Sequence, residues 1–220
     1  MLYSVFIALL LTINAWAAPP AQAAIQTLPK VDTRKVLLVF GDSLSAGYGV
    51  PTGQSYPDDL QRKLDAQGYG WRVVNLGISG DTTAGGLARV NTGVAVKPAL
   101  VLLELGGNDG LRGLPLAMTR DNLDQMIAAF VRVGARVVLA GMTLPPNYGP
   151  DYIRGFETVY SGLAAKYKLP LIPFLLQDIA TRDMRYFQRD GIHPTAEGAL
   201  IVSDTVLRAL KPMLGGANKN

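Results

Sequence analysis

Three side chains of the sequence could together perform nucleophilic catalysis on a carbonyl group. Ser43 follows an apolar run and a glycine, which places its hydroxyl at a sharp turn out of a strand. His193 is the only histidine of the chain, and Asp190 stands three residues before it, across Gly191. Pro194 keeps His193 in extended backbone, so a turn can bring the carboxylate to the imidazole. An aspartate placed there would fix the tautomer of a histidine that acts as a base near neutral pH.

Two further segments carry groups that could stabilise a negatively charged oxygen. Gly80 precedes a predicted helix, and a glycine lets a ligand approach its backbone N–H closely. Asn108, within a Gly-Gly-Asn-Asp-Gly segment, offers a side-chain amide donor. With the serine, the histidine and the aspartate, these groups would supply the nucleophile, base, orienting acid and oxyanion donors that acyl transfer requires.

Each segment also permits a simpler structural interpretation. Asp42 or Ser43 could cap a turn, and Gly80 could form a tight turn before a helix. The segment around Asn108 is rich in turn-forming residues, and His193 could bond a backbone carbonyl where the last helix begins. Four unrelated turns rarely present this set of groups by chance, so the joint pattern favours catalysis.

The composition excludes several other kinds of site. The chain has no cysteine and one histidine, which excludes thiolate zinc sites, iron–sulfur clusters, a cysteine nucleophile and a zinc site with two histidines. Two acidic residues near Asn108 could suggest a cation site, but no third carboxylate is spaced to complete it. The formal charge of +4 comes from scattered Lys and Arg, and no nucleotide-binding motif is present. We therefore expect no metal, no cofactor and no nucleic-acid partner.

Five short apolar runs predict the strands that would position these side chains. Such runs are typical of strands that are buried on both faces of a parallel sheet. They cover residues 35–40, 72–76, 99–105, 136–142 and 169–174. Pro170 and Pro173 favour an edge position for the last strand. Functional groups lie at the carboxyl ends of the strands in such a sheet, which is where the candidate residues stand.

Helical stretches separate and follow the five runs. They cover residues 54–67, 82–96, 119–133, 152–167 and 195–210. Thr119 and Thr195 are suitable N-cap residues, and Gly134 suits the position just after the third helix. The alternation predicts a three-layer α/β fold, a five-stranded parallel sheet with helices on both faces. A barrel would need eight strand–helix units, which the chain does not have.

The N-terminal segment differs from the rest of the chain. Residues 1–24 hold no charged side chain, contain an apolar run at 5–11 and end in small residues, which is typical of a secretory signal peptide. The run is too short to span a bilayer; an uncleaved anchor is the alternative, because residues 1–3 lack Lys and Arg. We expect a periplasmic or secreted protein with a linker at 25–34, one domain at 35–212 and a flexible tail at 213–220.

Four blocks of the sequence resemble those of the SGNH, or GDSL, hydrolases. They are GDSL at residues 41–44, Gly80, GGND at 106–109 and DGIHP at 190–194. Longer strings, GDSLSAGY, ISGDT, ELGGNDGLRG and LPPNYG, are most similar to the branch that includes periplasmic thioesterase I/protease I/lysophospholipase L1 and related arylesterases. The resemblance extends from about residue 36 to residue 210, nearly all of the expected mature chain.

The resemblance implies a flavodoxin-like hydrolase fold and a Ser–His–Asp mechanism. Ser43 would be the nucleophile, His193 the base and Asp190 the residue that orients the base. The oxyanion hole would consist of the backbone N–H groups of Ser43 and Gly80 together with the side-chain amide of Asn108. No cofactor or metal is implied.

The resemblance also implies an acyl chain that lies near the loops at residues 111–116 and 143–151. The candidate substrate contacts are Asp42, Leu44, Leu111, Pro145, Tyr148 and Ile192. We expect a monomer, not stably inserted in a membrane, that hydrolyses esters or thioesters of acyl chains, with aryl esters and lysophospholipids among the open possibilities. The alternatives are a carbohydrate O-deacetylase with the same residues and a non-catalytic doubly wound binding domain.

Overall fold

A five-stranded parallel sheet forms the centre of the structure, a computed structural model that describes residues 32–216. The strands lie in the order β2-β1-β3-β4-β5. Their bounds are Lys35–Gly41 for β1, Trp71–Asn75 for β2, Leu100–Glu104 for β3, Arg136–Ala140 for β4 and Leu171–Ile172 for β5. The predicted sheet is confirmed, with β5 at an edge. The predicted signal peptide and most of the predicted linker lie outside the described residues.

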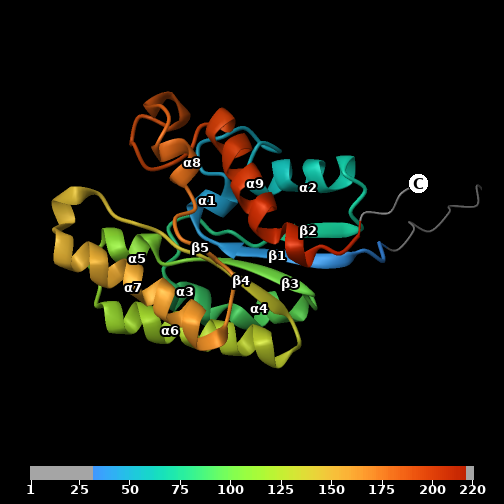
Figure 1. Cartoon of the computed structure of the whole chain (residues 1–220), viewed down its shortest axis with the longest axis horizontal. Helices are drawn as coiled ribbons and strands as arrows, with labels where there is room; N and C mark the ends of the chain where they lie inside the picture. The colour runs from blue at the N-terminus through green and yellow to red at the C-terminus, as the bar shows by residue number, and fades with distance from the viewer. Residues whose placement is uncertain (1–31, 217–220) are drawn as a thin grey trace, which may run out of the picture. The chain divides into compact units, whose positions relative to one another are not determined.

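Helices cover both faces of this sheet (Figure 1). One face carries α2 (Tyr56–Ala66) and α9 (Ala196–Leu210). The other face carries α3 (Thr83–Ala88), α4 (Val90–Ala95), α6 (Leu116–Arg132) and α7 (Pro150–Tyr167). Short helices and 3₁₀ turns complete the described chain: α1 (Ser43–Ala46), α5 (Gly107–Leu111), α8 (Gln177–Ala180), Pro146–Tyr148, Met184–Tyr186 and Lys211–Met213. No helix among the described residues is both long and apolar enough to cross a bilayer.

The three central strands supply most of the core. Leu37–Phe40 of β1 and Leu100–Leu103 of β3 are fully buried, and Val137–Ala140 of β4 are nearly so. The ring of Phe40 meets that of Phe130 in α6 edge-on, with centroids 5.5 Å apart. Each such side chain contributes roughly 1.5–3 kcal/mol by its burial. Helices on both faces therefore explain why these strands are almost continuously apolar.

The predicted helix at 82–96 is wrong in one respect, because the chain forms two short helices there with Arg89 between them. The guanidinium of Arg89 donates to Asp81 Oδ2 at 2.7 Å, to the Leu76 carbonyl at 2.8 Å and to the Gly41 carbonyl at 2.9 Å. These bonds hold Arg89 beside the ends of β1 and β2. The local pattern of small residues does not reveal such long-range partners.

The long helix α6 begins at Leu116, three residues before the predicted N-cap Thr119. Pro115 precedes its first turn, and a proline that ends an extended segment is compatible with a helix start. The Thr119 side chain is instead buried, with its hydroxyl 3.5 Å from Asp109 Oδ1. The N-cap predicted at Thr195 is confirmed, since its hydroxyl accepts the Gly198 N–H at 3.2 Å.

Packed structure continues beyond residue 212, the predicted end of the domain. Leu214 is buried, and its carbonyl accepts a hydrogen bond from the Trp71 indole at 2.9 Å. The Met213 carbonyl accepts one from the Arg136 guanidinium at 2.6 Å. These bonds attach the C-terminal segment to the first residues of β2 and β4. Residues 217–220 of the predicted tail lie outside the described residues.

Candidate active site

The serine, the histidine and one aspartate form a continuous hydrogen-bonded chain. Ser43 Oγ lies 2.9 Å from His193 Nε2, and His193 Nδ1 lies 2.7 Å from Asp190 Oδ2. A carboxylate can only accept, so Nδ1 carries the proton toward Asp190 and Nε2 of the neutral ring is free to accept the Ser43 proton. Residues 150 positions apart in the chain are thus joined at the carboxyl edge of the sheet.

A tight turn holds Asp190 in place. Its Oδ1 accepts the backbone N–H groups of Ile192 at 2.9 Å and of His193 at 3.0 Å. Partial burial raises the pKa of Asp190, but the N–H groups of His193 and Ile192 and the imidazole together lower that pKa below its ordinary value. Asp190 is therefore ionised beside the imidazole, as an acid that stabilises an imidazolium must be.

Other residues hold the imidazole from its sides. The Tyr48 ring lies against it with centroids 4.6 Å apart. The Gln188 N–H donates to the His193 carbonyl at 2.8 Å, and its side-chain amide donates to the Tyr48 carbonyl at 2.7 Å and to the Pro194 carbonyl at 2.9 Å. Gln188 therefore connects the segment that carries the histidine to the segment that follows the serine. Sequence reasoning missed both Tyr48 and Gln188 as supports.

Ser43 is held by the core of the domain. It is the first residue of α1, separated from the end of β1 by Asp42 alone, and is 8% exposed. Asp42 is the N-cap of α1, because its Oδ1 accepts the Leu44 N–H at 3.0 Å. The turn interpretation and the nucleophile interpretation of this segment are therefore compatible: Asp42 caps the short helix that presents Ser43.

The two other expected donors lie on loops beside this turn. Asn108 is in α5, the first helix after β3, and its Nδ2 donates to Asp42 Oδ2 at 3.2 Å and to the Asp81 carbonyl at 2.9 Å. Gly80 lies in the loop before α3, and its carbonyl accepts a hydrogen bond from the Arg112 side chain at 3.0 Å. Asn108 thus presents the nitrogen end of its amide to this region and bonds the residue that follows Gly80.

Glu104 is a buried carboxyl group whose role the sequence did not reveal. It is the last residue of β3, and its Oε2 accepts the Asp42 N–H at 3.2 Å and the Ser45 hydroxyl at 2.6 Å. Glu104 and Asp109 are the two acidic residues near Asn108 that could have suggested a cation site, and Asp109 instead accepts the N–H and hydroxyl of Thr83 at 2.8 and 2.6 Å. No group of three or more potential metal ligands occurs within residues 32–216.

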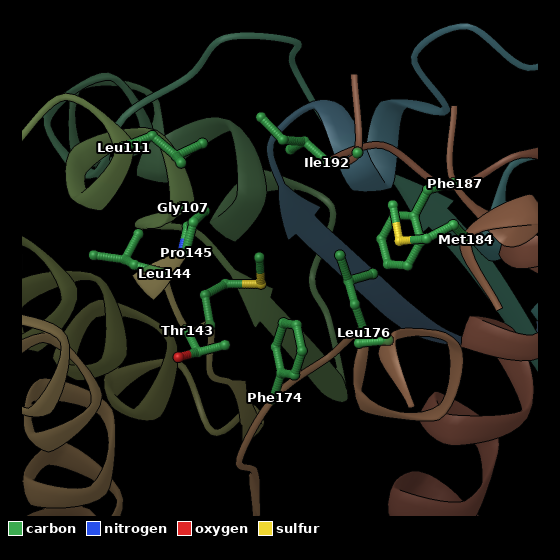
Figure 2. A pocket seen from close by; sticks show the side chains of 13 residues that line it. Gly107, Leu111, Thr143, Leu144, Pro145, Phe174, Leu176, Met184, Phe187 and Ile192 are labelled. Atoms are coloured by element: carbon green, nitrogen blue, oxygen red, sulfur yellow. The ribbon is translucent and has the colours of Figure 1, made fainter. Parts of the chain in front are cut away.

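An apolar cavity of about 280 Å³ lies next to the hydrogen-bonded chain. Figure 2 shows Leu111, Leu144 and Pro145 on one side of it and Leu176, Met184 and Phe187 on the other. Gly107 and Ile192, the neighbours of Asn108 and His193, also line it. The remaining lining residues are Met142, Thr143, Phe174, Ala180 and Gly191.

The structure separates the expected substrate contacts into two groups. Leu111, Pro145 and Ile192 line the cavity. Tyr148 is not a lining residue, but it donates its hydroxyl to the carbonyl of the lining residue Leu111 at 2.7 Å. Asp42 and Leu44 are instead turned into the core, with 3% and 7% of their surface exposed.

Residues 174–192 form one wall of the cavity, and sequence reasoning missed the part of it at residues 174–187. Its members Leu176, Met184 and Phe187 belong to a region of short turns without the regular periodicity that marks a helix or strand. The available signal for such a wall is an apolar side chain that stays exposed, and Met184 is 66% exposed. The sequence does not show which side chains are exposed, so the signal appears only in the structure.

The chain is similar to a known protein family and to two of its relatives. A model described as the GDSL-like Lipase/Acylhydrolase family matches residues 39–201. Esterase TesA of Pseudomonas aeruginosa is 46% identical over 193 residues, which are 87% of this chain and 95% of that protein. Thioesterase 1/protease 1/lysophospholipase L1 of Escherichia coli is 37% identical over 179 residues, 81% of this chain and 84% of that protein.

Solved structures share the fold. A crystal structure of TesA matches with a TM-score of 0.78 at 48% identity and covers 82% of this chain and 100% of that chain. The psychrotrophic esterase EstA from Pseudoalteromonas sp. matches with a TM-score of 0.78 at 32% identity and covers 83% of this chain and 100% of that chain. The predicted three-layer α/β hydrolase fold is therefore confirmed.

Proposed function

The chain belongs to the GDSL-like lipase/acylhydrolase family, and from this premise we propose that it is a serine hydrolase of acyl esters and thioesters that works through a covalent acyl–Ser43 intermediate. His193 is its base and Asp190 orients the base. The observation that carries the proposal is the hydrogen-bonded chain from Ser43 Oγ through the imidazole to Asp190.

The first half of the reaction transfers the acyl group to the enzyme. Ser43 Oγ forms a bond to the carbonyl carbon while its proton passes to His193 Nε2. Asp190 stabilises the resulting imidazolium. Collapse of the tetrahedral intermediate breaks the bond to the alcohol or thiol, and the leaving group takes the proton from Nε2.

Fixed donors stabilise the oxyanion of the tetrahedral intermediate. We assign this role to the N–H groups of Ser43 and Gly80 and the amide of Asn108. The Asn108 amide presents its nitrogen to this region, and its two N–H groups bond the Asp81 carbonyl at 2.9 Å and Asp42 Oδ2 at 3.2 Å. One of these N–H groups must therefore be shared with, or turn toward, the oxyanion in the transition state. Loss of one such donor typically costs about 3 kcal/mol of transition-state stabilisation.

The second half of the reaction releases the acid. A water molecule gives a proton to His193 Nε2 as its oxygen bonds to the acyl carbon. The new tetrahedral intermediate then breaks its bond to Ser43 Oγ, which regains the proton from Nε2. The enzyme returns to its starting state without a cofactor.

The acyl chain occupies the apolar cavity in this proposal. The cavity lies beside the residues that precede Asn108 and His193, so a bound chain would extend from the reacting carbonyl. Its volume of about 280 Å³ is near the lower end of ordinary ligand sites and suits a short or medium chain. An almost wholly apolar lining favours an acyl chain over an acetylated sugar, whose hydroxyl groups require polar partners.

Covalent labelling tests the proposed nucleophile. A fluorophosphonate probe should react with the wild-type protein, with Ser43 Oγ displacing fluoride, and peptide mass analysis should locate the adduct on Ser43. Ser43→Ala should abolish both labelling and hydrolysis of p-nitrophenyl esters. Ser161→Ala is a matched control, because Ser161 is an exposed serine of α7 whose hydroxyl donates to carbonyl groups of its own helix. An adduct on another residue, or a fully active Ser43→Ala protein, would refute the proposal.

A panel of p-nitrophenyl esters from acetate to palmitate, run beside a lysophospholipid, tests the acyl site. We expect kcat/KM to peak at short or medium chains. Ala180→Phe, which narrows the cavity, should lower kcat/KM for long chains more than for acetate. Ala165→Phe, on the exposed surface of α7, is the control. An Ala180→Phe protein with an unaltered chain-length profile would place the acyl chain elsewhere.

We also propose that residues 1–24 act as a signal peptide and that the mature protein is a periplasmic or secreted monomer. The support is the uncharged N-terminal sequence with its short apolar run. N-terminal sequencing of the protein from the periplasmic fraction, followed by measurement of its mass in solution, tests both parts.

A further inference from the structure

Two carboxyl groups are buried together beneath Ser43. Asp42 is 3% exposed and Glu104 is 0% exposed, and the Asp42 backbone N–H donates to Glu104 Oε2 at 3.2 Å. Glu104 lies opposite Gly41 in the β1–β3 register, and a Cβ at residue 41 would overlap the Glu104 carboxyl and the Ser45 hydroxyl. The pair is therefore closely packed in the core at the carboxyl ends of two central strands.

One oxygen of the pair lacks a donor. Glu104 Oε2 accepts the Asp42 N–H and the Ser45 hydroxyl, whereas Oε1 is buried and has no hydrogen-bond partner within residues 32–216. Burying a carboxylate oxygen without a donor is costly. A carboxylic acid avoids that cost, because its O–H can donate to the neighbouring Asp42 carboxylate.

The contacts of Asp42 are those of the ionised member of the pair. Its Oδ1 accepts the Leu44 N–H at 3.0 Å, and its Oδ2 accepts the Asn108 amide at 3.2 Å. Both oxygens thus face donors, as expected of a carboxylate. A single proton on Glu104 satisfies both carboxyl groups.

The surroundings favour retention of that proton. Burial, and next the charge of the neighbouring carboxyl, raise the pKa of Glu104 well above its ordinary value, and burial raises the pKa of Asp42 to about 6. The titratable or charged groups that face the pair are Tyr56 from α2, Asp81 and Arg89 beside α3, Tyr160 from α7 and His193. Arg89 is the permanent cation of this set, and it pairs with Asp81. Both tyrosines have pKa values raised by burial and then by Glu104, so they remain neutral.

We propose that Glu104 is a positioning residue: it holds one proton against Asp42, so that the Asp42 carboxylate keeps the nitrogen end of the Asn108 amide directed toward the oxyanion site. The positioning role rests on the function proposed above. The Asp81 carbonyl also accepts from this nitrogen, at 2.9 Å, and a protonated Asp42 would oppose that orientation, because its O–H would donate to the amide oxygen of Asn108. A pair without any proton would place a second negative charge beneath the oxyanion.

Glu104→Gln and Asp42→Asn separate the two protonation states. The glutamine side chain would keep the shape of the acid, donate its amide to Asp42 and accept from the Asp42 N–H and Ser45. We therefore expect Glu104→Gln to lower kcat by about threefold or less, because one neutral hydrogen-bonding group replaces another.

In Asp42→Asn the new NH2 group must face either the Leu44 N–H or the Asn108 amide, and both of these are donors. We expect kcat to fall about 100-fold with KM changed by less than about threefold, the effect of a misdirected oxyanion donor.

Difference infrared spectroscopy locates the proton directly. At neutral pH the wild-type protein should show the carbonyl stretch of a protonated carboxylic acid, and Glu104→Gln should remove it. Glu197→Gln, the same change at an exposed residue of α9, should leave the band in place. Thermal unfolding of each variant shows whether a change in kcat reflects lost structure.

Two results would overturn the positioning role in an active enzyme. One is the absence of an acid band that depends on Glu104. The other is a folded Glu104→Gln protein that loses as much kcat as Asp42→Asn, which would show that Glu104 acts as a carboxylate. A wild-type protein that neither hydrolyses esters nor reacts with a fluorophosphonate would instead refute the proposed function, and the positioning role with it, whatever the infrared band shows.

Discussion

The proposed active site joins two regions that are built in different ways. The nucleophile region, residues 41–45, sits at the end of a central strand, and Ser43 is 8% exposed. The base loop, residues 181–195, has little regular structure, and its Met184 is 66% exposed. The sheet core positions Ser43, the proposed nucleophile, whereas a local turn around Asp190 positions His193, the proposed base. Stability and catalysis should therefore be separable in the base loop and linked in the nucleophile region.

Removal of the base should have the largest effect. His193→Ala should lower kcat by about 10⁵-fold or more, because the chain has no second histidine to accept the Ser43 proton. The free energy of unfolding should change by less than about 1 kcal/mol, because the base loop lies at the surface. Steady-state kinetics with p-nitrophenyl acetate and urea unfolding measure the two quantities. A folded variant within tenfold of wild-type kcat would contradict the triad.

Asp190→Asn should have the next largest effect. Its amide could donate to Nδ1 and so stabilise the wrong tautomer, which lowers kcat by roughly 10³- to 10⁴-fold while the geometry is retained. The same kinetic assay applies, with Asp183→Asn as a control elsewhere in the base loop. Equal losses in both variants would indicate damage to the loop and would argue against a specific role for Asp190.

A pair of glycine substitutions compares the stability of the two regions. In Gly41→Ala the new Cβ overlaps Ser45 and Glu104, and we expect a loss of about 3 kcal/mol in the free energy of unfolding. Gly191 has φ of +69°, but the nearest atom to a Cβ there is Met184 Cε at 3.7 Å, so Gly191→Ala should cost only about 1 kcal/mol. Urea unfolding of both variants tests the difference. A greater loss at residue 191 would reverse the comparison.

The dependence of stability on pH should have opposite signs in the two regions. The pKa values of Asp42 and Glu104 are raised, so the folded state binds more protons than the unfolded state. Their contribution to the free energy of unfolding is therefore lost as the pH rises. For Asp42 the loss extends from about pH 4, the ordinary carboxyl value, through about 6. The pKa of Asp190 is lowered, so the unfolded state binds the proton more readily. The contribution of Asp190 to the free energy of unfolding is therefore lost as the pH falls.

Unfolding by urea over a range of pH tests these signs. Glu104→Gln should flatten the decline in stability toward alkaline pH, and Asp190→Asn should flatten the decline toward acid pH. An exposed carboxyl such as Asp151 provides the control, through Asp151→Asn. A Glu104→Gln protein with the same alkaline slope as wild type would show that Glu104 does not retain its proton in the folded state.

The sheet could be predicted because its signal is local and repeated. Runs such as residues 35–40 and 99–105 are apolar throughout, and only burial on both faces makes that arrangement favourable. The break at Arg89 and the early start of α6 could not be predicted. Both depend on partners from other elements. Arg89 binds the carbonyl groups of Leu76 and Gly41, and Thr119, the predicted N-cap, is buried in the core beside Asp109.

The residues of the candidate site also differ in whether the sequence alone could identify them. The residues expected to react could be selected by chemical type, because one histidine, one nearby aspartate and one serine after a strand leave few combinations. The supporting residues could not. Glu104 has the sequence appearance of any strand terminus, and its importance depends on the close approach of Asp42, which only the pairing of β1 with β3 creates.

The apolar cavity takes one wall from the loops after the central strands and the other from residues 174–192. The second wall is made of short turns, and loops of this kind accept substitutions with little loss of stability. Substitutions at Met184, Phe187 and Ile192 should therefore change the proposed acyl preference while the buried residues around Ser43 stay the same. Divergence among such enzymes should accumulate on that wall first.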